Sequence, residues 1–72
     1  MLSGIRAAEA RALMGLIREI RAEGTTIIMI EHIMQAIMAL SDRVVVLHHG
    51  EKIADGPPAA VARDAAVIEA YL

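Results

Sequence analysis

A run of consecutive large apolar residues at positions 27–30 lies between Gly24 and the polar pair Glu31 and His32. The run is short, rich in β-branched residues and free of polar alternation, which is typical of a strand buried on both faces. We therefore expect a buried strand over residues 25–31 of an α/β sheet. Ligands of such sheets bind beyond the carboxyl ends of the strands, where Glu31 and His32 would lie.

The segment after this run predicts a helix and a second strand. Residues 32–40 carry apolar side chains at helical spacing, and Ser41 and Asp42 end that pattern. Residues 43–47 form a second apolar run, so the order is strand, helix, strand. A βαβ unit of this kind has a right-handed connection in about 98% of cases.

A helix before this unit and a hairpin after it are also expected. Residues 3–23 combine a turn with a helix that has one apolar stripe, and Gly24 is suited to end it. A glycine-containing turn at 48–51 leads into a short antiparallel return strand at 52–55.

Two short helices are expected near the end of the sequence. Pro58 suits the first turn of a helix over residues 58–63, because that position leaves its backbone N–H unused. Asp64 can cap the last helix with its side-chain oxygen. The expected fold class is therefore α/β, with one βαβ unit, an antiparallel hairpin strand and C-terminal helices.

Composition excludes several classes of protein. A chain of 72 residues allows one small domain, which buries only about 60% of its unfolded surface. Hydrophobic residues make up 57% with a single Tyr and no Phe, Trp or Cys, so we expect apolar surfaces that meet a partner, and no disulfide. A net charge of −2 with interspersed basic residues indicates no nucleic-acid binding. Neither a membrane span nor a signal peptide is apparent, so the cytoplasm is the expected compartment.

His32 is the main candidate for chemistry, and two interpretations stay open. It could be a histidine at a helix start that a nearby backbone carbonyl satisfies. It could instead contact a ligand phosphate or an activated water, because imidazole changes its proton state near neutral pH. Glu31 could act as a general base, but we expect it to be solvated or to cap the following helix.

Other candidates have weaker patterns. Neighbouring His48 and His49 would point to opposite sides of a strand, and His32 is distant in sequence, so no metal site is expected. Methionines at core spacing are expected to fill gaps, namely Met14, Met29, Met34 and Met38. The phosphate-loop pattern G-x-x-x-x-G-K-[ST] is absent, and residues 2–4, Leu-Ser-Gly, are too short to replace it.

The order of these features resembles the C-terminal part of an ABC-transporter ATPase subunit. The resemblance rests on Gly-Thr-Thr-Ile-Ile-Met-Ile-Glu-His at 24–32, Ser-Asp-Arg before the apolar run at 41–47, Ile-Ala-Asp-Gly at 53–56 and Val-Ile-Glu-Ala-Tyr-Leu at 67–72. It is most similar to the type that energises branched-chain amino acid uptake. By this resemblance, residues 1–72 are one partial nucleotide-binding domain of the P-loop NTPase class.

The resemblance implies roles for individual residues. His32 would be the switch histidine of the H-loop, residues 31–33, which contacts the γ-phosphate of ATP and helps to organise the attacking water. Residues 2–6 would be a remnant of the D-loop, which crosses to the partner subunit. Three positions depart from the family pattern, since Arg6 replaces an Asp or Asn, Ile33 replaces an aspartate and Pro57 replaces a residue that is often Thr.

The function implied is that of the ATP-binding subunit of an importer, with ATP and Mg²⁺ needed only in the full-length domain. The Walker A loop, signature motif and Walker B strand have no match in the sequence, so we expect the chain alone to be inactive. Expected partners are transmembrane permease subunits and a second ATPase subunit at the inner face of the cell membrane. The alternative is a small non-catalytic module with ancestral ATPase likeness, which binds proteins or self-associates through an exposed sheet edge.

Overall fold

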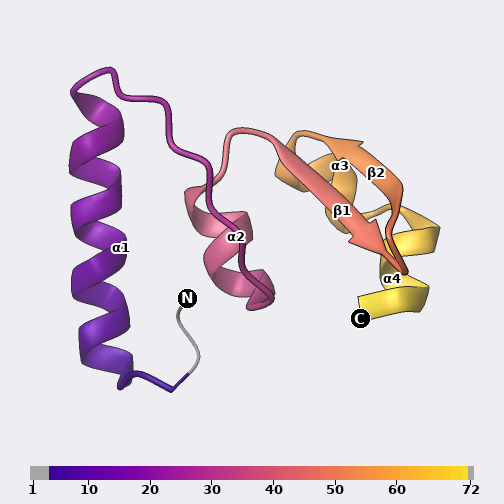
Figure 1. Ribbon diagram of the computed structural model, residues 1–72, viewed down its shortest axis with the longest axis horizontal. Coiled ribbons are helices and arrows are strands. Elements are labelled where there is room, and N and C mark those ends of the chain that lie inside the picture. Colours follow the sequence, from indigo (N-terminus) through magenta and orange to yellow (C-terminus); the bar gives the residue numbers. More distant parts are fainter. Residues whose placement is uncertain (1–3, 72) are drawn as a thin grey trace. The chain divides into compact units, whose positions relative to one another are not determined.

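The computed structural model describes residues 4–71, in which four helices and one two-stranded sheet form (Figure 1). Contacts divide the chain after Leu40 into two compact units, and each is described by itself. Among the described residues, no helix has the length and apolar character needed to cross a membrane. Residues 2 and 3 of the expected D-loop remnant, and Leu72, lie outside the described part.

The first unit begins with helix α1, Ala7–Ala22, which confirms the helix expected before Gly24. The chain leaves this helix through Gly24, whose φ of 96° lies in the left-handed region that favours glycine. The Gly24 amide donates to the carbonyl oxygen of Arg21 at 2.9 Å, so the end of the helix keeps a hydrogen-bonded turn. The apolar stripe of α1 is only partly covered, because none of its residues is buried.

The expectation of a strand over residues 25–31 is wrong. This segment is extended but pairs with no other strand in the described chain, and Ile28 and Ile30 are each 89% exposed. A strand depends on hydrogen bonds to a neighbour, and apolar side chains alone do not supply one. The first strand of the expected βαβ unit is therefore absent from residues 4–71, and the unit with it.

Helix α2, Met34–Leu40, follows the extended segment and starts two residues later than expected. Ala36 and Leu40 are its buried residues. The Arg21 guanidinium donates through Nη1 to the carbonyl oxygen of Leu40 at 2.6 Å. This bond joins the last turn of α1 to the end of α2, and it satisfies a carbonyl that the helix itself leaves unpaired.

The second unit opens with a β-hairpin that confirms the expected turn and return strand. Strand β1, Val44–His48, pairs antiparallel with β2, Glu51–Gly56. His49 and Gly50 form the connection, with φ of 51° and 78°. Positive φ at both central residues defines a type I′ turn, whose twist matches that of the flanking strands.

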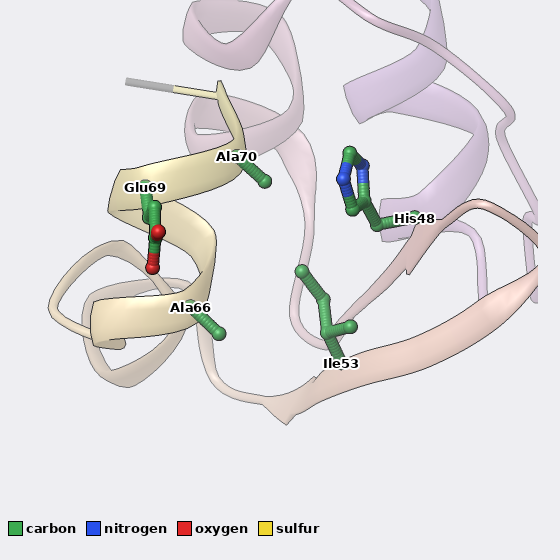
Figure 2. Close-up of a pocket in the computed structure, with 5 residues that line it drawn as sticks. All are labelled: His48, Ile53, Ala66, Glu69 and Ala70. Atoms are coloured by element: carbon green, nitrogen blue, oxygen red, sulfur yellow. The ribbon is translucent and has the colours of Figure 1, made fainter.

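A β-bulge interrupts the hairpin register. Val46 is opposite Ala54 whereas Leu47 is opposite Lys52, so Ile53 is the extra residue in β2. The bulge turns the Ile53 side chain toward helix α4, Ala65–Tyr71 (Figure 2).

Helices α3, Pro58–Ala62, and α4 pack against β2 and against each other. The core of this unit consists of four valines, Val44, Val46, Val61 and Val67. Pro58 begins α3, and the Asp64 carboxylate accepts a hydrogen bond from the Ala66 amide at 2.9 Å, which confirms both expected helix starts. Only one face of β1 is covered, because Val45 and Leu47 are exposed.

An ion pair spans the two strands. Arg43 donates through Nε and Nη2 to the two carboxylate oxygens of Asp55, at 2.8 and 2.7 Å. Lys52 Nζ lies 3.5 Å from the same carboxylate. The hydrogen bonds from Arg43 lower the pKa of Asp55 to about 2, and the nearby positive charges act in the same direction.

Candidate functional site

The His32 side chain projects into solvent at the end of the extended segment, just before α2. It is 71% exposed, and the backbone bends at this residue. A structural histidine would be covered by its neighbours, so this position leaves the ring available to a ligand. The extended chain places His32 after an apolar run, as expected, although that run is not a strand.

Glu31 has the opposite environment to its neighbour. Its side chain is 0% exposed, and its Oε1 accepts a hydrogen bond from the His32 backbone amide at 3.0 Å. The same oxygen lies 3.4 Å from His32 Nδ1. The expectation of a solvated or helix-capping acid is therefore wrong, because the carboxylate turns back onto the residue that follows it. The sequence signal that could have indicated this was the adjacency of an acid and an imidazole.

The described part of the expected D-loop remnant, residues 4–6, lies on the surface before α1. Gly4 has a φ of 86°, a left-handed conformation that favours glycine. Arg6 pairs with Glu9 in the first turn of α1, with Nε 3.2 Å from Oε1. The residue that departs from the family pattern is therefore engaged locally with an acid.

A groove of about 500 Å³ runs between α1 and α2 in the first unit. Its wall is mostly alanine and larger apolar side chains, with Arg11 and Gln35 as polar members. Ile33, next to His32, is one of the lining residues.

A hollow of about 430 Å³ lies between the hairpin and α4 in the second unit, and Figure 2 shows its lining. Ile53, Ala66 and Ala70 supply apolar surface, and His48 stands at the edge. The His48 ring packs edge-on against the rings of His49 and Tyr71, at centroid distances of 4.1 and 5.8 Å. The two histidines do not point apart as expected, since His49 belongs to the turn rather than to the strand.

Residues 4–71 do not assemble a metal site. No group of three or more His, Asp or Glu side chains in the described chain could hold a metal ion. The single lysine of the sequence, Lys52, faces Asp55.

Comparison with known proteins places this arrangement in a family. Residues 51–72 match the family model described as "Branched-chain amino acid ATP-binding cassette transporter". The high-affinity branched-chain amino acid transport ATP-binding proteins BraF of Pseudomonas aeruginosa and LivG of Escherichia coli are 38% and 39% identical to it over 71 residues. Those matches cover 97% of this chain and 28% of each relative. The ribose import ATP-binding protein RbsA 2 of Mesorhizobium japonicum is 45% identical over 51 residues, 71% of this chain and 10% of that protein.

The chain is therefore related to the C-terminal region of the ATP-binding subunits of ABC transporters. Within that class it corresponds to the C-terminal region of the branched-chain amino acid type, as the sequence motifs predicted. No solved structure matches the fold of this chain.

Proposed function

We propose that this chain supplies the H-loop of an ABC importer's ATP-binding subunit, with His32 as the switch histidine that acts during ATP hydrolysis. The observation that carries the proposal is the exposure of the His32 ring, which lies after an extended apolar segment in a chain related to such subunits over 97% of its length. Residues 31–33 form the H-loop in this proposal, and residues 2–6 form the remnant of the D-loop.

The proposal treats residues 1–72 as a single partial nucleotide-binding domain of the P-loop NTPase class. ATP, when bound in a complete domain, supplies the phosphoryl group that is hydrolysed. His32 can then accept or donate one hydrogen bond at the reacting centre, since its ring is open to solvent. Because the sequence has no match to the phosphate-loop pattern with its lysine, we expect that the chain alone does not hydrolyse ATP.

Partners and location follow from the same proposal. A switch histidine works in an ATPase that faces a second ATPase subunit and transmembrane permease subunits. The chain would then lie on the cytoplasmic side, peripheral to the cell membrane. The cargo class of the assembled transporter would then be branched-chain amino acids, by analogy with the names of BraF and LivG.

A chimera tests this proposal directly. This chain replaces the matched C-terminal region of LivG from E. coli, and the ATPase activity of the assembled transporter is measured. The His32→Asn variant is expected to lose about a hundredfold or more of that activity, the scale of a lost acid–base contact. Nucleotide binding by the same variant checks that the domain has folded.

The matched control is His49→Asn, because asparagine tolerates the left-handed backbone at that turn. It is expected to leave the ATPase rate unchanged. Equal activity in the His32→Asn and unsubstituted chimeras would contradict the proposal, and so would ATP turnover by the purified 72-residue chain.

The exposed apolar residues favour a second candidate function, a small protein-binding or self-associating module. Ile28 and Ile30 on the extended segment are exposed, and so are Val45 and Leu47 on β1. Apolar surface next to unpaired backbone favours strand addition. Sedimentation at high concentration tests this function. A monomer that stays compact would exclude self-association, whereas a dimer lost in Ile28→Lys would support it.

A further inference from the structure

Ile33, the residue after His32, differs from the isoleucines that precede the site. Ile28 and Ile30 are each 89% exposed, whereas Ile33 is half-buried and lines the groove between α1 and α2. Side chains of consecutive residues in an extended chain point to opposite sides. With Ile33 at the groove, the His32 ring is directed away from it, in agreement with its exposure of 71%.

The backbone of Ile33 begins helix α2. Its carbonyl oxygen accepts a hydrogen bond from the Ile37 amide at 3.2 Å, the first bond of the helix, so Ile33 is the N-cap residue. A short polar side chain is preferred at an N-cap, because its oxygen accepts a bond from a free amide of the first turn. Isoleucine has no such oxygen, whereas the aspartate of the family pattern would supply one.

The groove offers a different attachment for this residue. Ala10 and Met14 of α1 line it together with Ile33, and so does Ala36, which is buried on α2. An apolar side chain that loses contact with water in such surroundings holds the start of α2 against α1. The carbonyl and the side chain of Ile33 therefore fix this residue in two ways, and His32 is one peptide bond away.

We propose that Ile33 is a positioning residue for His32: its side chain in the apolar groove anchors the start of α2 in place of a capping side chain, and this anchor fixes the direction in which the His32 ring projects. The inference deepens the proposed function, on which its catalytic meaning rests. No contact with substrate is assigned to Ile33, which acts only through the backbone that it shares with His32.

Backbone NMR of the 72-residue chain tests the inference without nucleotide. Ile33→Ala removes most of the apolar side chain and is expected to lower the ¹H–¹⁵N heteronuclear NOE of the His32 amide, which reports local order. The Ile37 amide, which bonds to the carbonyl of residue 33, is expected to exchange about tenfold faster. Chemical shifts of α1 check that the first unit remains folded.

Three further variants separate positioning from a general loss of apolar surface. Ile33→Val keeps most of the side chain and is expected to retain the order of His32, so it still tests the inference if the alanine variant unfolds. Ile33→Asp can cap α2, so the Ile37 amide is expected to stay protected. Ile30→Ala is the matched control, because it removes the same atoms from an exposed isoleucine, and it is expected to change nothing.

An unchanged order of His32 in Ile33→Ala would overturn the inference, and so would an equal loss of order in Ile30→Ala. An Ile37 amide that exchanges as fast in Ile33→Asp as in Ile33→Ala would overturn it too.

The chimera with LivG tests the catalytic meaning. Ile33→Ala is expected to lower kcat for ATP hydrolysis about tenfold or more with an unchanged KM for ATP, because a displaced catalytic group slows the reaction without weakening binding. Ile33→Val is expected to keep kcat. An unchanged kcat in Ile33→Ala would overturn the inference even where His32→Asn loses activity. If His32→Asn stays active instead, the proposed function fails while the NMR result for Ile33 stands.

Discussion

The hydroxyl of Tyr71 donates a hydrogen bond to the backbone carbonyl oxygen of Leu47, 24 positions earlier in the chain. The bond joins the last turn of α4 to the end of β1, and the same ring lies edge-on to His48. A single side chain therefore fastens the C-terminal helix to the hairpin in two ways, through its polar tip and through its ring.

Removing only the hydroxyl tests the polar part of this attachment. Tyr71→Phe keeps the ring contact and is expected to lower the free energy of unfolding by about 1 kcal/mol, the usual net contribution of a hydrogen bond. Tyr71→Leu removes both contacts and should cost more. Urea unfolding followed by circular dichroism measures both losses. An unchanged stability in Tyr71→Phe would show that the hydroxyl contributes nothing, and equal losses in the two variants would show that the ring contributes nothing.

The valine core predicts a larger effect. Val67 is 0% exposed in the second unit, so Val67→Ala is expected to cost about 1–3 kcal/mol through lost burial and the cavity that remains. Tyr71 is the sole tyrosine, and its fluorescence reports unfolding of this unit. Ile68→Ala on the same helix is the control, because Ile68 is exposed and should cost clearly less.

Much of the second unit could be predicted from sequence because its signals are local. The glycine of the turn, Pro58 at a helix start and Asp64 at a cap each act on their immediate neighbours, and all three elements form as expected. The segment at residues 25–31 could not be assigned correctly in this way. Its side chains predict a strand, but a strand requires a partner, which local sequence does not reveal.

The candidate site, too, could be predicted from the sequence only in part. The exposure of His32 agrees with the position expected for a functional residue, whereas the burial of Glu31 contradicts its expected solvation. Acidic side chains are seldom buried, so an acid considered by itself is expected at the surface. Only the path of the backbone through residues 31 and 32 brings the carboxylate onto the amide that follows it.

The pairing of Arg43 with Asp55 makes the hairpin sensitive to acid. The pKa of Asp55 is lowered to about 2, whereas an unfolded aspartate has its usual value of about 3.9. The stabilisation is therefore present above about pH 4 and is lost as the pH falls toward about 2. NMR titration of the Asp55 carboxyl carbon and hairpin unfolding between these values measure the effect. Asp55→Asn should abolish this pH dependence, and a titration midpoint near 3.9 in the folded chain would contradict it.

The turn residues predict effects of opposite sign. Gly50→Ala places a Cβ at a φ of 78° and is expected to destabilise the hairpin by about 1–2 kcal/mol. His49→Asn is expected to stabilise it slightly, because asparagine tolerates a φ of 51° better than histidine. Hydrogen exchange of the β1 and β2 amides measures both changes. A faster exchange in His49→Asn would indicate that the contact between the His48 and His49 rings outweighs the backbone preference.

The bulge at Ile53 has a consequence for comparing this chain with its relatives. The extra residue lets β2 keep Lys52 outward and Ala54 inward while it adds a branched side chain beside α4. A hairpin without the bulge would need one residue fewer to preserve the same alternation. A relative with a one-residue gap opposite Ile53 in an alignment would therefore pack its C-terminal helix differently against the hairpin. Such a gap would not be a neutral shortening of a loop.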